Sequence, residues 1–302
     1  MRRPTFLFAS AAMLLSPFAY APSSRPAITN LTFVRFHVSD VTSASHFYGE
    51  TLGLPRLGPG IGSGEIKDPA FFVNPYQHLE IKKGTLPNDR DLIDAIGIQT
   101  ADTKSLRQYL LARGLIPGDL VADSPTSSHF EISDPGQHRI IFASFGGFGG
   151  DVMGVSKAVS NRLIHSGFIV RDRAAMEHFY KDILGFKSYW RGGMKENQTD
   201  WLDLQVPDGT DWIEFMLNVP ANADKHTLGV MNHIALGVPD IHAAAKQLLT
   251  NGMKLTEEPK IGRDGKWQLN LYDPDDTRVE LMEFTPVQKP CCSEYTGPHP
   301  KP

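Results

Sequence analysis

The chain has 302 residues, of which 41% are hydrophobic and 21% charged, and its formal net charge is −4. This length allows two domains of ordinary size, and the composition is that of a folded globular protein, which excludes an intrinsically disordered chain. The small net charge gives no reason to expect nucleic acid or an anionic membrane surface as a partner.

The N-terminal segment has the three parts of a secretory signal peptide. Arg2-Arg3 precedes an apolar run from Phe6 to Leu15, and Ala19-Tyr20-Ala21 offers a cleavage site flanked by small residues. We therefore expect residues 1–21 to be a signal peptide and residues 22–29 a linker. This predicts a secreted or periplasmic protein that has no membrane contact after cleavage.

Four strand patterns in the rest of the chain each run into an aspartate that precedes a helix pattern. The aspartates are Asp40, Asp102, Asp172 and Asp240, and the helix patterns cover 41–52, 103–113, 173–184 and 241–251. A glycine follows each helix pattern, as is common where a helix ends in a left-handed residue. Short alternating strand patterns separated by turn residues come next. The repeating unit is therefore βαβββ, four times over, and the fold class is α+β.

The four units fall into two pairs. A glycine-rich stretch at 146–158 reads as the linker between them, so we predict one domain at 30–145 and a second at 159–286.

The last segment, 287–302, is a proline-rich tail that contains both cysteines of the chain, Cys291 and Cys292. Two adjacent cysteines cannot form a disulfide framework for a fold. We expect an extended tail with either a vicinal disulfide or free thiols. The alternatives are a second metal site, formed by both thiols and His299, and an intermolecular bridge.

The second pair of units repeats a histidine and a glutamate. His165 and His233 lie on the first strands of their units, while Glu214 and Glu280 lie on the last strands, at nearly the same separation along the chain. Because alternate side chains of a strand point to opposite faces, all four point away from the apolar face that packs on the helices. Imidazole and carboxylate together bind divalent ions such as zinc, nickel, cobalt, manganese and iron(II). The pattern predicts one divalent-metal site in the second domain; the alternative is four polar side chains at sheet edges, each satisfied by solvent or a neighbour.

The first domain keeps only one of these donors. Its equivalent positions are Phe33, Glu80, Ala95 and Ile141, so we expect it to have lost the metal site. The same face carries polar side chains that form either a solvated structural surface or a site for an anion, namely Arg35, His37, His78, Lys82 and Gln99.

Paired βαβββ units with histidine and glutamate on their first and last strands resemble the vicinal oxygen chelate superfamily, which includes glyoxalase I, extradiol dioxygenases, epimerases and bleomycin-resistance proteins. The resemblance covers about residues 30–286. It implies two tandem glyoxalase-like domains, each a cupped eight-stranded mixed sheet with helices outside. The four donors map onto the ligand pattern of the glyoxalase I-like members, namely His165, Glu214, His233 and Glu280.

For function, the resemblance implies a lyase, isomerase or epimerase that acts on a small oxygen-chelating substrate through a metal-stabilised enediolate. Either Glu214 or Glu280 would be the catalytic base. Export argues against the glutathione-bound substrate of glyoxalase I, and we expect a monomer or a homodimer. Weaker candidates for the substrate wall are Trp190, Trp267, Asn270 and Arg278.

Extradiol ring cleavage is the main alternative, because His165, His233 and Glu280 match the two-histidine, one-carboxylate Fe(II) site of those enzymes. Two features depart from that pattern. Glu214 would occupy a position that iron leaves open for oxygen, and no histidine follows His242 in the domain, where the family places an acid–base histidine. A third alternative is a non-catalytic small-molecule-binding protein of the bleomycin-resistance type, against which the intact metal donors argue.

Overall fold

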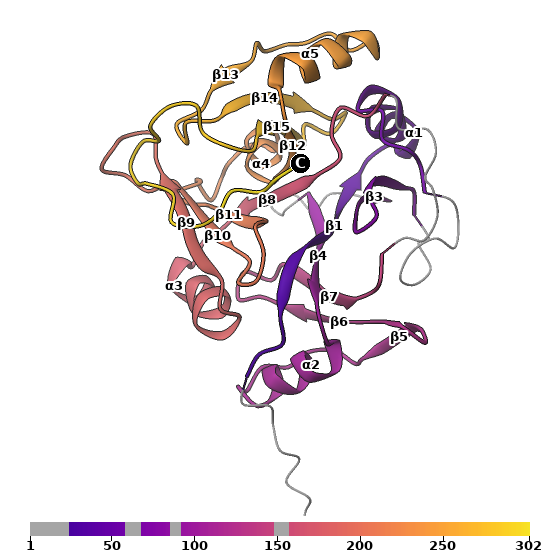
Figure 1. The fold of residues 1–302 in the computed structure, drawn as a ribbon, viewed down its shortest axis with the longest axis vertical. Coiled ribbons are helices and arrows are strands. Elements are labelled where there is room, and N and C mark those ends of the chain that lie inside the picture. Colours follow the sequence, from indigo (N-terminus) through magenta and orange to yellow (C-terminus); the bar gives the residue numbers. More distant parts are fainter. Residues whose placement is uncertain (1–23, 58–67, 85–91, 148–156) are drawn as a thin grey trace, which may run out of the picture.

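The computed structural model describes residues 24–57, 68–84, 92–147 and 157–302. The predicted signal peptide and positions 148–156 of the predicted linker lie outside these residues. Two curled mixed sheets make up the described part, and their helices lie on the outside (Figure 1). The prediction of two tandem glyoxalase-like domains of the α+β class is confirmed.

The first sheet has seven strands in the order β2-β3-β1-β4-β7-β6-β5. Its strands are β1 (Ile28–Val38), β2 (Ala70–Asn74), β3 (Gln77–Lys83), β4 (Ile93–Thr100), β5 (Val121–Ser124), β6 (Ser127–Ser133) and β7 (Arg139–Ser144). Its helices are α1 (Val41–His46), which continues as the π-helix η1 (Phe47–Thr51), and α2 (Thr103–Leu111). We expected eight strands. Among the described residues, the eighth is reduced to a single bridge between Arg56 and Phe71.

The second sheet has the expected eight strands, in the order β13-β14-β15-β12-β8-β11-β10-β9. They are β8 (Leu163–Ile169), β9 (Lys187–Gly192), β10 (Trp201–Gln205), β11 (Trp212–Met216), β12 (His233–Val238), β13 (Lys260–Ile261), β14 (Trp267–Tyr272) and β15 (Arg278–Glu283). The helices are α3 (Arg173–Glu177), which continues as the π-helix η3 (His178–Ile183), α4 (Lys225–Met231) and α5 (Ile241–Thr250). Only α4 lies outside the four predicted helix patterns.

The recurring aspartates cap the helices. In every unit the aspartate side chain accepts a hydrogen bond from the backbone N–H three residues further on, at 2.7 to 3.0 Å. Such a cap satisfies one of the free donors at the start of a helix. The glycines after the helices have φ between 68° and 90°, as expected of left-handed closing residues: Gly53, Gly114, Gly185 and Gly252.

The two domains dock through a reciprocal pair of hydrogen bonds. Tyr48 in η1 of the first domain donates to Asp273 in the turn before β15, at 3.0 Å. Tyr180 in η3 of the second domain donates to Asp134 in the turn before β7, also at 3.0 Å. Both tyrosines are fully buried. Each domain therefore fixes the other by the same contact, and the apolar core is continuous across the interface.

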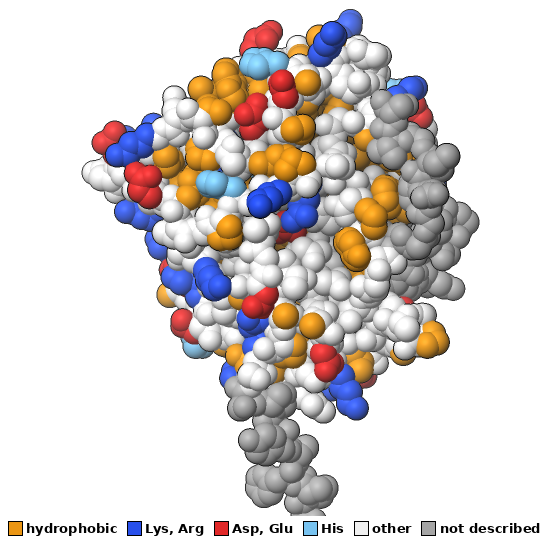
Figure 2. Space-filling view, in the orientation of Figure 1, with side chains coloured by type: hydrophobic (Ala, Val, Ile, Leu, Met, Phe, Trp, Pro, Cys, Tyr) orange, Lys and Arg blue, Asp and Glu red, His pale blue; other side chains and the backbone are white. Residues whose placement is uncertain are grey.

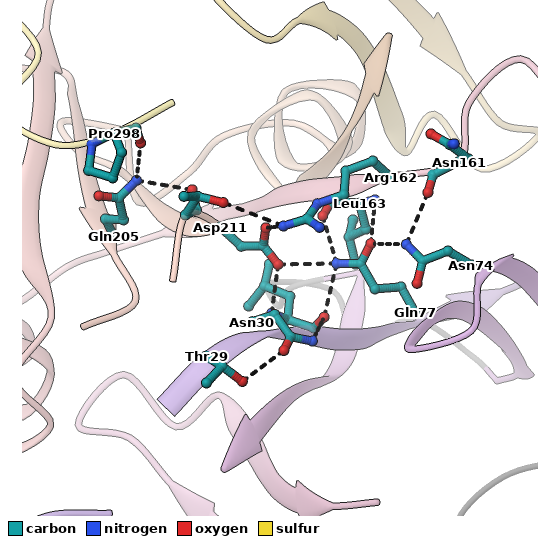
Figure 3. A network of polar contacts seen from close by, with 12 residues as sticks. Thr29, Asn30, Asn74, Gln77, Asn161, Arg162, Leu163, Gln205, Asp211 and Pro298 are labelled. Atoms are coloured by element: carbon teal, nitrogen blue, oxygen red, sulfur yellow. Dashed lines mark hydrogen bonds and ion pairs between the residues drawn. The ribbon is translucent and has the colours of Figure 1, made fainter. Parts of the chain in front are cut away.

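A buried amide and a buried carboxylate tie β1 to β8 at the centre of this interface (Figure 3). The Gln77 amide donates to the carbonyl groups of Leu31 and Leu163, at 3.0 and 2.8 Å. Asp211, which is 0% exposed, accepts from the Leu31 N–H and from Arg162. These bonds use backbone groups of Leu31 and Leu163, on two strands that belong to different sheets.

The tail at 287–302 contains no helix or strand. Cys291 and Cys292 form a vicinal disulfide, as one of the expected alternatives. His299 Nδ1 lies 2.6 Å from the Tyr189 hydroxyl, so the described tail does not gather its thiols and this histidine into a second metal site.

No helix in the described part of the chain is long and apolar enough to cross a bilayer. On the face seen in Figure 2, acidic and basic side chains are interspersed.

We expect Tyr48→Phe to lower the free energy of unfolding by about 1–3 kcal/mol, because Asp273 is left buried without one of its donors. Urea-induced unfolding followed by tryptophan fluorescence measures this. Tyr76→Phe is the matched control, since Tyr76 is 51% exposed, and should change stability by less than about 0.5 kcal/mol. Equal stability of the two variants would contradict the role of the reciprocal pair.

Candidate metal centre

The seam between β8 and β12 brings the two histidines together. The strands are antiparallel, and their register sets His165 opposite Ala235 and His233 opposite Gly167. Small partners leave room for both rings. A Cβ atom added at Gly167 would lie 2.0 Å from His233 Cε1, so only glycine fits there. The two Nε2 atoms are 3.1 Å apart.

The flanking parallel strands bring the glutamates to the same place. β11 sets Glu214 beside Gly167, and β15 sets Glu280 beside Ala235. Glu214 Oε2 lies 3.0 Å from His233 Nε2 and 3.8 Å from His165 Nε2. Glu280 Oε2 lies 3.7 Å from His165 Nε2 and 4.0 Å from His233 Nε2. The structure thus gathers all four predicted donors from four different strands.

Two of these distances, 3.0 Å from Glu214 Oε2 to His233 Nε2 and 3.1 Å between the two Nε2 atoms, match the spacing around one shared cation, and the other three, at 3.7 to 4.0 Å, are longer. Donor atoms bound to a transition-metal ion at about 2.0–2.2 Å lie roughly 3 to 3.6 Å from one another. The donor atoms of His165, Glu214 and His233 all lie within 4.8 Å of one another. Two imidazoles and two carboxylates also balance the charge of a divalent ion.

The hydrogen bonds around His233 leave Nε2 free of a proton. Arg278 lies 2.7 Å from His233 Nε2, and because a guanidinium only donates, Nε2 must be the acceptor. The ring proton is then on Nδ1, which faces the Met231 carbonyl oxygen at 3.4 Å. In this tautomer the Nε2 lone pair accepts from Arg278, so it becomes free to bind a metal once the guanidinium moves aside.

Burial disfavours every charge in the cluster. It lowers the pKa of His165 and His233 well below the ordinary value, and neighbouring Arg278 lowers both further. Burial also raises the pKa of Glu214 and of Glu280 to about 7. Desolvated carboxylates next to neutral imidazoles are unfavourable by themselves, and a dication would offset that cost.

A cavity of about 160 Å³ opens beside the donors. Two of the weaker candidates for the substrate wall, Trp190 and Arg278, line it. Asn270 lies opposite Glu280 but donates to Glu257 at 3.2 Å. Trp267 is three positions from Asn270 on the same strand, so it points to the other face, where its ring lies 4.9 Å from that of His242.

Further polar and aromatic residues of the cavity were not among the predicted site residues. They include Trp201, Asp203, Arg263, Asp264 and Gln268. The sequence carried a signal for Asp203, because it alternates with Trp201 along β10. The structure places Asp203 opposite Glu214 in register. No periodicity marks Arg263 and Asp264, which lie in the turn between β13 and β14.

The equivalent place in the first domain is filled by apolar side chains. Phe33, Ala95 and Ile141 form a small buried cluster there. Arg35 takes the position of Gly167 and pairs with the remaining acid, Glu80, at 2.5 Å. Four basic side chains share Asp94, which lies 3.0 to 3.4 Å from Arg35, His37, Lys82 and Arg139. This face therefore neutralises its own charges.

A family model described as the Glyoxalase/Bleomycin resistance protein/Dioxygenase superfamily matches residues 162–281. The second domain belongs to this superfamily. It is the vicinal oxygen chelate superfamily that the sequence pattern resembles, and the matched residues hold all four donors.

Two curated relatives align with about this domain. A lactoylglutathione lyase from Haemophilus influenzae is 27% identical over 124 residues, which make up 40% of this chain and 92% of that protein. A probable chloroplastic lactoylglutathione lyase from Arabidopsis thaliana is 25% identical over 146 residues, which make up 47% of this chain and 41% of that protein. The chain thus spans less than half of the Arabidopsis relative.

Two solved structures share the whole two-domain fold. A 2,3-dioxygenase from a Pseudomonas species matches with a TM-score of 0.64 and 15% identity, over 92% of this chain and 96% of that chain. A Mn(II)-bound glyoxalase from Novosphingobium aromaticivorans matches with a TM-score of 0.64 and 18% identity, over 85% of this chain and 83% of that chain. At these identities the likeness concerns the fold alone.

We expect Gly167→Ala to weaken divalent-metal binding on the order of 10- to 100-fold, because the added methyl group displaces the His233 ring. Metal titration monitored by calorimetry measures the affinity, and circular dichroism checks the fold. Gly146→Ala is the control, since no heavy atom lies within 4 Å of a Cβ at that position. Unchanged affinity in Gly167→Ala would show that His233 is not a ligand.

The two raised carboxyl pKa values predict how stability depends on pH. Each rises from 4.5 to about 7 on folding, so folding favours the protonated forms. Their contribution to stability is complete below about pH 4.5 and is lost as the pH rises through about 7. We expect the melting temperature of chelator-treated protein to fall between about pH 4.5 and 7, and added Zn²⁺ to restore it most at about pH 7 and above. In the double variant Glu214→Gln/Glu280→Gln, this slope should be absent; a slope that persists would assign it to other groups.

Proposed function

We propose that this protein is an exported, divalent-metal-dependent enzyme of the glyoxalase type, which moves a proton at a carbon next to an oxygen atom of a small chelating substrate. One observation carries the proposal. Two imidazoles and two carboxylates converge beside a cavity, with the Nε2 and carboxylate oxygen atoms 3.0 to 4.0 Å from one another across each imidazole–carboxylate pair and 3.1 Å between the two imidazoles. The superfamily of the second domain and its lactoylglutathione lyase relatives support this class of chemistry.

His165, Glu214, His233 and Glu280 would hold the ion, which when bound supplies a Lewis acid that makes a neighbouring C–H more acidic. The protein residues do the rest. Glu214 and Glu280 both line the cavity, so either carboxylate can take a proton from a substrate atom inside it. Arg278 also lines the cavity and can donate to a substrate oxygen.

The dimensions of the cavity favour a compact reacting group. A cavity of about 150 Å³ encloses one benzene-sized group, and the space beside the donors is about 160 Å³. Trp190, Trp201 and Met216 supply an apolar side, and Arg263 and Arg278 supply cationic donors. We infer a small substrate with neighbouring oxygens and an anionic group that the arginines recognise. The signal-peptide pattern supports export, which argues against glutathione as part of the substrate.

The test compares Glu214→Gln with Glu280→Gln. Glutamine keeps the size of the side chain but cannot accept the proton, so the variant at the base should lose metal-dependent turnover by at least about 100-fold while the fold is retained. Deuterium uptake from D₂O at the carbon next to the carbonyl of small hydroxycarbonyl acids measures the step, monitored by NMR. Elemental analysis of the native protein identifies the ion. Full exchange activity in both variants would reject the role of the glutamates.

Extradiol ring cleavage is the second candidate, and the 92% coverage by the dioxygenase fold favours it. His165, His233 and Glu280 would then hold Fe(II). Glu214 argues against it, because its carboxylate lies 3.0 Å from His233 Nε2, at a position that oxygen would need. Oxygen uptake on catechols distinguishes the two candidates: uptake by Fe(II)-loaded protein without deuterium exchange would favour the dioxygenase.

A further inference from the structure

The tail after β15 joins the two edges of the second sheet. We name residues 287–300 the strap. The strand order leaves β13 at one edge of the sheet and β9 at the other. Near the first edge, the Val287 N–H donates to the Gly265 carbonyl oxygen at 2.8 Å. At the second edge, the Thr296 N–H donates to the Tyr189 carbonyl oxygen at 3.0 Å, and the strap runs beside β9 (Figure 1).

Cys291 is the point where the strap holds both edges at once. Its N–H donates to the Arg263 carbonyl oxygen at 2.7 Å, in the turn between β13 and β14. Its own carbonyl oxygen accepts from Trp190 Nε1 at 3.2 Å, on β9. The Arg263 guanidinium also lies 2.7 Å from the Cys291 sulfur. Trp190 and Arg263 both line the metal cavity, so one residue of the strap fixes two parts of its wall.

The strap also covers a buried cation behind the cavity. Tyr295 of the strap donates to the Asp264 carbonyl oxygen at 3.1 Å. The Lys266 ammonium lies 5.1 Å from the Tyr295 ring and 4.7 Å from the Trp212 ring. Lys266 is 0% exposed, and its Nζ has no hydrogen-bond partner among the described residues. Displacement of Tyr295 would therefore expose the Lys266 ammonium to water, so the position of the strap affects the interior of the curled second sheet.

The disulfide restricts the backbone conformation of the strap at Cys291 and Cys292. Cys292 has a φ of 74°, in the left-handed region that residues with a side chain rarely adopt. The Cys291–Cys292 disulfide closes a ring through the peptide bond between the two residues and so holds that conformation. Once the sulfurs are separate thiols, nothing covalent keeps Cys292 there, and a return to ordinary φ values would redirect Cys291 and Ser293. The Ser293 hydroxyl accepts a hydrogen bond from the Arg191 N–H on β9, at 3.0 Å.

We propose that the strap is a thiol-controlled latch across the metal cup. With the disulfide formed, the strap closes the gap between β9 and the β13–β14 turn and holds Trp190 and Arg263 at the cavity. A dithiol reductant transfers two electrons and two protons to the S–S bond, becomes a disulfide itself, and leaves two cysteine thiols and a released strap. This inference concerns access to the cup and holds for any reaction that the metal centre performs.

Hydrogen–deuterium exchange on the full chain tests the latch. We expect the amides of Cys291 and Thr296 to exchange about tenfold faster after treatment with dithiothreitol, because their hydrogen bonds open locally. Amides in β12 and β15 should keep their rates. Cys291→Ser/Cys292→Ser has side chains of similar size without the disulfide, and should exchange as fast as the reduced protein with no further response to dithiothreitol. Alkylation of the thiols followed by mass spectrometry verifies the redox state in each sample.

Acrylamide quenching of tryptophan fluorescence gives an independent measurement, since Trp190 and Trp201 line the cavity. Quenching should increase on reduction in the native chain and be already increased in the double serine variant. Two results would overturn the proposal. One is equal protection of the strap amides in both redox states, which would make the disulfide irrelevant to closure. The other is faster exchange throughout β12 and β15, which would mean that the whole domain loosens.

Discussion

The antiparallel seam between β8 and β12 is the constraint on which the metal centre depends. Its register lays each histidine ring over a position that has almost no side chain, Gly167 or Ala235. The parallel strands on either side then place a glutamate beside each of these two positions. Backbone ladders thus hold four polar groups together in a desolvated place, where each finds few partners besides the others. Such an arrangement is costly for an empty protein and favourable for one that binds a cation.

The first domain has the same strand arrangement but does not bury four polar groups together. At the positions of the three missing donors it has the apolar cluster Phe33, Ala95 and Ile141, and at the position of Gly167 it has Arg35, which neutralises Glu80. Apolar packing and an ion pair therefore take the place of the two histidines and two glutamates of the second domain. This domain contributes instead to the interface, where Tyr48 and Asp134 match Tyr180 and Asp273 of the other domain. Gln77 of this domain also joins β1 to β8, the strand that carries His165, through the carbonyl groups of Leu31 and Leu163.

A curled sheet of eight strands leaves two edges, and here the strap connects them. The contacts of Cys291 and Tyr295 reach cavity residues on one side and the buried Lys266 on the other. Cavity, buried charges and strap therefore form one connected structure. The metal donors lie at its centre, and the cysteines lie at its outer rim, where a reductant has access to them.

The sequence by itself determined the four repeats, the pairing into two domains and the two histidines and two glutamates that share one face of the second sheet. These depend on local patterns: an aspartate before each helix, a glycine after it, and alternation along each strand. The tertiary structure alone decided the contact of Arg278 with His233, the reciprocal tyrosine–aspartate bonds and the position of the strap. Each of these contacts joins residues that are remote in the chain. The strap also has no periodic pattern, so only the packed sheets determine which groups its proline-rich backbone contacts. The placement of Trp267 needed both. Alternation along β14 already puts Trp267 and Asn270 on opposite faces of the sheet, and the register with β15 then shows that Asn270 is the one beside Glu280.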